Sequence, residues 1–166
     1  ENTPIPITQE SFLEICSRFL GEKALNELEN LTLVPSLDLE KSNSALIEAW
    51  NNGERDLRLA LGKVRADKMG KPFDFKTVNS SVELSKVANY AVEIENPLEA
   101  ENFLLNYRLN FLETLRPMDG FSEDYIFYYA LKLKLISRIR QFDTVFGENT
   151  YKDIYNSILS GDTQEA

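Results

Sequence analysis

Histidine is absent from the sequence, and Cys16 is the only cysteine. These two gaps exclude a Ser-His or Cys-His catalytic pair, a zinc site and an internal disulfide, since each needs the missing side chains. Cys16 lies in an apolar stretch, so we expect it in the core rather than as a reactive thiol. No cofactor motif is present, and we expect no cofactor or metal.

Long hydrophobic runs are also absent. No stretch approaches the roughly 18 consecutive apolar residues of a membrane span, and no basic segment followed by an apolar one opens the chain. The 166 residues are 43% apolar, as is typical of a globular protein with one core. We therefore expect a single helical domain over residues 1–166, in a cytoplasmic protein without direct membrane insertion.

Basic residues are scarce, with 18 against 27 acidic ones and a net charge of −9. Phosphate binding needs a concentrated basic face, so we do not expect nucleic acid as a partner. The segment 55–76 comes closest to such a face and leaves nucleic-acid binding as a weaker alternative. A second basic cluster contains Lys132, Lys134, Arg138 and Arg140. This uneven charge is typical of proteins that dock against other proteins in a fixed orientation.

Apolar residues recur at helical spacing along most of the chain, and no segment alternates long enough to predict a strand. The expected helices run from about 8 to 21, 23 to 30, 42 to 70, 82 to 92, 96 to 115, 122 to 142 and 148 to 159. The pattern predicts an all-α, irregular bundle of about six or seven helices, with a frayed tail from about residue 160.

Several helix ends are marked by specific residues. Thr8, Ser122 and Asn96 are expected N-caps, and Asn96 is followed by Pro97 and by Glu99 at the capping-box position. Glycine weakens a helix interior, so Gly53 predicts a kink or break near residues 51–53. The helix over 122–142 is apolar on nearly all sides and should occupy the middle of the bundle.

Two pairs of charged residues have a spacing that points to helix contacts. Arg58 and Arg65 are seven apart and share one helix face, as do Glu101 and Arg108 on a later helix. We expect these helices to face each other, with Glu99 or Glu101 pairing with Arg58 or Arg65 and fixing their register. The alternative is a solvated charged face, on which ion pairs contribute only about 0 to 1 kcal/mol.

Lys132 lies among apolar residues and allows two interpretations. A buried lysine with a depressed pKa could form a Schiff base; alternatively, its stem lies along the core while the ammonium reaches water or a carboxylate. We favour the second, because no phosphate loop, nucleophile elbow or second catalytic group accompanies it. Adjacent acids such as Glu123 and Asp124 are better explained as first-turn residues favoured by the helix dipole than as a metal or acid-base pair. We expect no enzymatic activity.

Three stretches of the sequence together carry a family resemblance. They are Trp50 followed by residues 57–66 (LRLALGKVRA), residues 95–101 (ENPLEAE) with Arg108, and residues 129–138 (YALKLKLISR). In this order they resemble a bacterial family of unknown function that is encoded among the genes of a V-type (A/V-type) rotary ATPase. The resemblance extends from about residue 12 to residue 159.

The resemblance implies a place in an assembly. Family members are similar in character to the helical C or d subunit, which caps the membrane rotor and receives the central shaft, although this chain is short for a complete one. It therefore implies a non-catalytic subunit or assembly factor that couples through contacts with stalk or rotor subunits, at the inner face of the membrane. The alternative is a free-standing cytosolic adaptor. The charged positions that match the family, as interaction or helix-register residues, are Arg58, Arg65, Glu99, Glu101, Arg108, Lys132 and Arg138.

Overall fold

The computed structural model describes residues 7–35, 42–73, 81–141, 152 and 155. Within these ranges the chain forms six α-helices and no strand, which confirms the expected all-α, multi-helix fold. The helices are α1 (Gln9–Cys16), α2 (Glu22–Glu29), α3 (Ala45–Lys68), α4 (Val82–Glu93), α5 (Pro97–Thr114) and α6 (Glu123–Gln141). Apart from residues 152 and 155, the expected last helix and the tail lie outside the described residues.

The predicted N-caps are confirmed by their hydrogen bonds. Thr8 accepts from the Ser11 backbone N–H at the start of α1, and Asn96 accepts from the Leu98 N–H at the start of α5. The Ser122 hydroxyl accepts from the Tyr125 N–H at 3.2 Å and caps α6. Each cap satisfies a backbone donor that has no partner within its helix, so these helix starts are set locally by the sequence.

The end of α1 differs from the prediction. The helix stops at Cys16 instead of continuing to Gly21, and the Ser17 hydroxyl donates to the Glu14 carbonyl at 2.7 Å. Such a bond offers the backbone an alternative to continued helix. As a result Phe19, expected on the apolar face of the helix, is 81% exposed.

The break expected near residues 51–53 is also wrong, because α3 continues through Gly53 without interruption. The ring of Phe111 on α5 occupies the space that a side chain at this position would need. A Cβ built on Gly53 would lie 2.3 Å from Cζ of Phe111. The glycine therefore serves a contact between helices rather than a bend.

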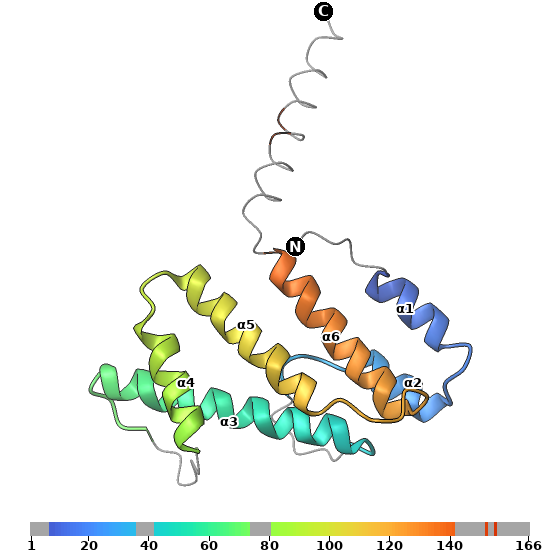
Figure 1. Ribbon diagram of the computed structural model, residues 1–166, viewed down its shortest axis with the longest axis horizontal. Helices are drawn as coiled ribbons and strands as arrows, with labels where there is room; N and C mark the ends of the chain where they lie inside the picture. The colour runs from blue at the N-terminus through green and yellow to red at the C-terminus, as the bar shows by residue number, and fades with distance from the viewer. Residues whose placement is uncertain (1–6, 36–41, 74–80, 142–151, 153–154, 156–166) are drawn as a thin grey trace, which may run out of the picture.

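Helix α6 lies in the middle of the bundle, as predicted, and packs against α1, α2, α3 and α5 (Figure 1). Helix α4 packs on α3 and α5 at the other side. None of the helices in the described ranges is both long and apolar enough to cross a membrane.

The buried residues form two clusters. The first surrounds α6 and includes Cys16, Trp50 and Leu131; burial there raises the pKa of the Cys16 thiol, as expected for a core cysteine. The second joins α3, α4 and α5 and includes Leu57 and Ala88. Helices α3 and α5 contribute to both clusters, so the region between these two helices is where the two parts of the core meet.

Candidate functional site

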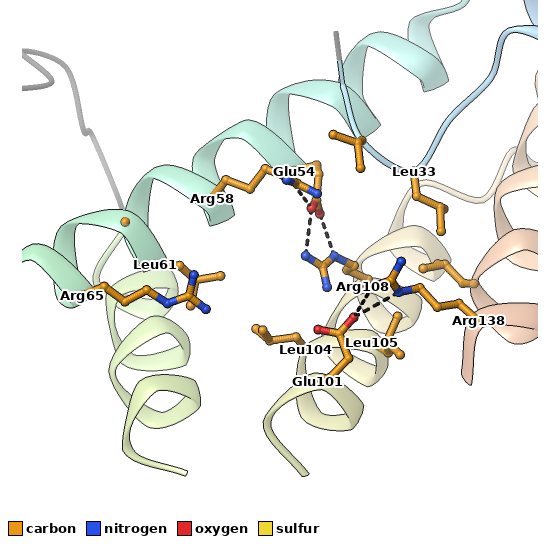
Figure 2. Close-up of a pocket in the computed structure, with 13 residues that line it drawn as sticks. Leu33, Glu54, Arg58, Leu61, Arg65, Glu101, Leu104, Leu105, Arg108 and Arg138 are labelled. Carbon is orange, nitrogen blue, oxygen red and sulfur yellow. Dashed lines mark hydrogen bonds and ion pairs between the residues drawn. The ribbon is translucent and has the colours of Figure 1, made fainter. Parts of the chain in front are cut away.

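A pocket of about 400 Å³ lies between α3, α5 and α6, where the two core clusters meet (Figure 2). Its lining residues recur at three, four or seven positions along each helix, so each helix presents one face to it. They are Glu54, Arg58, Leu61, Gly62 and Arg65 of α3, Glu101, Leu104, Leu105 and Arg108 of α5, Leu135 and Arg138 of α6, and Leu33 and Val34. We call this the arginine pocket.

Glu54 is the centre of a buried charge cluster at one end of the pocket. Its side chain is 2% exposed and accepts two hydrogen bonds from Arg108, Nε to Oε2 and Nη2 to Oε1, each 2.9 Å long. Arg58, one turn along α3, donates its Nε to the same Oε1 at 2.9 Å. The two-pronged bond from Arg108 fixes the orientation of the carboxylate and ties α5 to α3.

The other charged residues of the pocket differ in whether they form ion pairs. Arg138 of α6 donates to Oε1 of Glu101, with Nη2 at 3.0 Å. Arg65 extends from α3 into the pocket (Figure 2). Within the part of the chain that the structure describes, its guanidinium has no hydrogen-bond or ion-pair partner.

Among the residues that the structure describes, four arginines and two glutamates line the pocket, which is an excess of two positive charges. The whole chain has the opposite sign, with a net charge of −9. A local excess of arginine in a partly enclosed space attracts anions, because the guanidinium group binds carboxylate and phosphate through paired hydrogen bonds.

Five of the seven charged residues singled out in the sequence line this pocket: Arg58, Arg65, Glu101, Arg108 and Arg138. The expectation that α3 and α5 present charged faces to each other is confirmed, but the expected partners are wrong. Neither Glu99 nor Glu101 pairs with Arg58 or Arg65. Arg58 and Arg108 share Glu54, and Glu101 pairs with Arg138 of α6.

Glu54 is the residue that sequence reasoning missed. It lies four residues after Trp50 and three before Leu57, so helical spacing places it inside the buried stripe of α3. A carboxylate at such a position is almost never buried without a cationic partner. This spacing is the signal in the sequence that could have identified Glu54. It predicts a buried carboxylate and therefore a cationic partner, such as an arginine, on a facing helix.

Glu99 lies outside the pocket. It is at the third position of α5, where it accepts a hydrogen bond from the Asn96 side-chain amide at 3.2 Å. The donor is the side chain of the N-cap residue rather than its backbone N–H, so the bond lies at the helix start but is not the capping box expected from the sequence.

Lys132 also lies outside the pocket, in a cluster with Glu113 and Tyr128. Its ammonium pairs with the Glu113 carboxylate and lies 3.2 Å from the Tyr128 hydroxyl. The hydrogen bond from Lys132 lowers the pKa of Glu113, and the same bond raises the pKa of Lys132. A raised pKa contradicts the Schiff-base interpretation, which required a depressed one, and agrees with an ammonium that reaches a carboxylate.

The Lys132–Glu113 pair predicts a pH-dependent stability difference. The stability from a lowered carboxylate pKa is present at neutral pH and is lost as the pH falls through the pKa of folded Glu113. Because both side chains are more than a third exposed, we expect Glu113→Gln to lower the free energy of unfolding by at most about 1 kcal/mol at pH 7. Urea unfolding at pH 7 and at a series of lower pH values should show this difference shrinking as the pH falls. The control is Glu95→Gln, at an exposed carboxylate outside the cluster; an equal acid-sensitive loss there would contradict the prediction.

A second prediction concerns the effect of Arg65 on stability. If Arg65 were in a buried ion pair, its removal would destabilise the fold, but here we expect almost no change. Because it is exposed and its guanidinium is unpaired within the described residues, Arg65→Ala should change the free energy of unfolding by no more than about 0.5 kcal/mol. Thermal or urea unfolding of the two proteins checks this. A loss above about 2 kcal/mol would show that Arg65 stabilises the fold itself.

No group of three or more Cys, Asp or Glu within the described residues could hold a metal ion. No protein-family model, curated protein or solved structure matches this chain. The family resemblance therefore rests on its sequence motifs alone.

Proposed function

We propose that this protein is a non-catalytic helical subunit that docks onto a protein partner through the arginine pocket. The observation that carries the proposal is the convergence of Arg58, Arg65 and Arg138, from two helices, on one space with excess positive charge. An acidic side chain or chain terminus of a partner has the complementary charge. Steering of acidic groups towards such a site increases the rate and specificity of association.

The assembly in which we place this docking is the V-type (A/V-type) rotary ATPase. The support comes from the family resemblance, whose charged positions include the five that line the pocket. In this proposal the partner is a stalk or rotor subunit and the protein lies in the cytoplasm, at the inner face of the membrane. It couples or assembles other subunits, while nucleotide chemistry takes place elsewhere.

The second candidate is a free-standing cytosolic adaptor unrelated to the ATPase. The same pocket would then receive an acidic group of a different protein. The identity of the captured partner separates the two candidates, because each requires the pocket but only one requires the ATPase.

The test is affinity purification of the tagged full-length protein from its native cells in mild detergent, followed by quantitative mass spectrometry. Three baits are compared: the wild type, Arg65→Glu, and Lys63→Glu as the control. Lys63 is exposed on α3 but does not line the pocket, so the control makes the same charge change two residues away. We expect stalk or rotor subunits with the wild type and with Lys63→Glu, and their depletion with Arg65→Glu.

Two results would contradict this proposal in different ways. If ATPase subunits are present in the lysate but are not enriched by any bait, the ATPase is not the partner. If they are enriched equally by all three baits, the arginine pocket is not the docking point.

A further inference from the structure

The arginines of the pocket differ in the donors they have left for a ligand. Arg108 is committed to Glu54 through two hydrogen bonds, and Arg138 to Glu101. Arg58 uses only its Nε, so both of its terminal nitrogens lack a partner within the described residues, and there Arg65 has none at all. Two guanidinium groups on one face of α3, two turns apart, are therefore available to an anion.

The charge of the pocket indicates which anion fits. A phosphate monoester carries about −1.5 to −2 charges at pH 7 and three strong acceptor oxygens, which matches Arg58, Arg65 and the excess of two positive charges among the described lining residues. A single carboxylate would neutralise only half of that excess. Both anions accept hydrogen bonds from guanidinium groups, but the phosphate monoester neutralises more of the positive charge and offers more acceptor oxygens.

The rest of the lining indicates what the phosphate is attached to. Leu61, Leu104, Leu105 and Leu135 line the pocket, whereas no aromatic residue is among its described lining residues. Leucine side chains accept an aliphatic group, but a nucleobase would lack a ring on which to stack. The volume of about 400 Å³ lies within the range of small-molecule sites.

We infer that the arginine pocket binds a small aliphatic phosphate monoester through Arg58 and Arg65, with its carbon chain against the leucines. The regulatory part of the inference rests on the proposed function: the phosphate monoester and the acidic group of the partner compete for the same two arginines. Docking would then be weakened when the phosphorylated compound is abundant.

Isothermal titration calorimetry of the full-length protein with monobutyl phosphate tests the binding. We expect one site per chain, and an affinity at least about tenfold higher than that for butyrate, which has a similar chain but a single charge. Inorganic phosphate should bind more weakly than monobutyl phosphate, because it lacks the carbon chain. AMP should also bind more weakly, because no aromatic ring for its base to stack on is among the described lining residues.

Arg65→Gln should weaken the binding of monobutyl phosphate by about tenfold or more, because a charge-assisted contact is lost, while Lys63→Gln leaves it unchanged. Three results would overturn the inference. These are no binding of monobutyl phosphate to the wild type, equal affinity for butyrate or AMP, and equal weakening by the two substitutions.

A competition experiment separates this inference from the proposed function. Monobutyl phosphate should elute the captured partner from the wild-type protein, whereas butyrate at the same concentration should not. If Arg65→Glu abolishes partner capture but monobutyl phosphate does not bind, the ligand inference fails and the docking proposal stands. If monobutyl phosphate binds through Arg65 but the Arg65→Glu bait captures the partner as well as the wild type does, the docking proposal fails and the ligand site stands.

Discussion

Replacing Glu54 with leucine should lower the free energy of unfolding by about 3 kcal/mol, the largest effect we expect from a single charged residue of the pocket. The cause lies in Arg108, which is only 13% exposed and donates twice to this carboxylate. Without Glu54 its charge remains largely out of water and has lost the carboxylate to which it donates. Urea unfolding of the wild type and Glu54→Leu, monitored by circular dichroism, measures the difference.

A matched control is Glu101→Leu, which removes the other glutamate of the pocket. Its partner Arg138 is half exposed and can be hydrated, so the loss should stay within about 1 kcal/mol. The double substitution Glu54→Leu with Arg108→Met should recover most of the stability, because it replaces a buried ion pair with apolar groups of similar size. Equal losses for both glutamates, or a double variant as unstable as Glu54→Leu, would contradict this account.

The helix starts could be predicted from the sequence because their causes are local. Thr8, Asn96 and Ser122 cap helices through bonds to residues two or three positions away, and such bonds need no knowledge of the rest of the fold. The central position of α6 could be predicted for a similar reason, since a helix that is apolar on nearly all sides has to be covered. These features account for the correct fold class.

The candidate site could be predicted only in part. Spacing along α3 and α5 placed Arg58 with Arg65 and Glu101 with Arg108 on common faces, and the structure puts all four on one pocket. The partner of each arginine depends on how the helices rotate about their axes, which is set by packing across the whole core. Glu101 therefore pairs with Arg138 of α6, 37 residues away, rather than with an arginine of α3.

The same limit explains why the prediction of a kink or break at Gly53 is wrong. A glycine weakens an isolated helix, but here the missing side chain leaves room for Phe111 of α5, which also stacks on Trp50 with ring centroids 6.1 Å apart. Phe111 lies three residues after Arg108, so both side chains reach towards α3 from one face of α5. Phe111 lies against Gly53, and Arg108 donates to the adjacent residue Glu54. The glycine thus allows α5 to be placed so that Arg108 meets Glu54.

This arrangement predicts that Gly53→Ala destabilises the protein although alanine is the better helix former. The added methyl would displace the Phe111 ring and cost about 1 to 3 kcal/mol, more than the roughly 0.5 to 1 kcal/mol gained from helix propensity. In a protein that already carries Phe111→Leu, the smaller side chain can move aside, and Gly53→Ala should then stabilise by about 0.5 kcal/mol.

The reversal of sign, measured by urea unfolding of the four proteins as a double-mutant cycle, distinguishes overpacking from a general intolerance of substitution in α3. Loss of stability in both backgrounds would mean that the backbone at Gly53, rather than the Phe111 ring, requires glycine at this position.

The binding of monobutyl phosphate provides a second readout. If Phe111 and Arg108 are placed together, Gly53→Ala should also weaken its binding, because displacing Phe111 shifts the face of α5 that lines the arginine pocket.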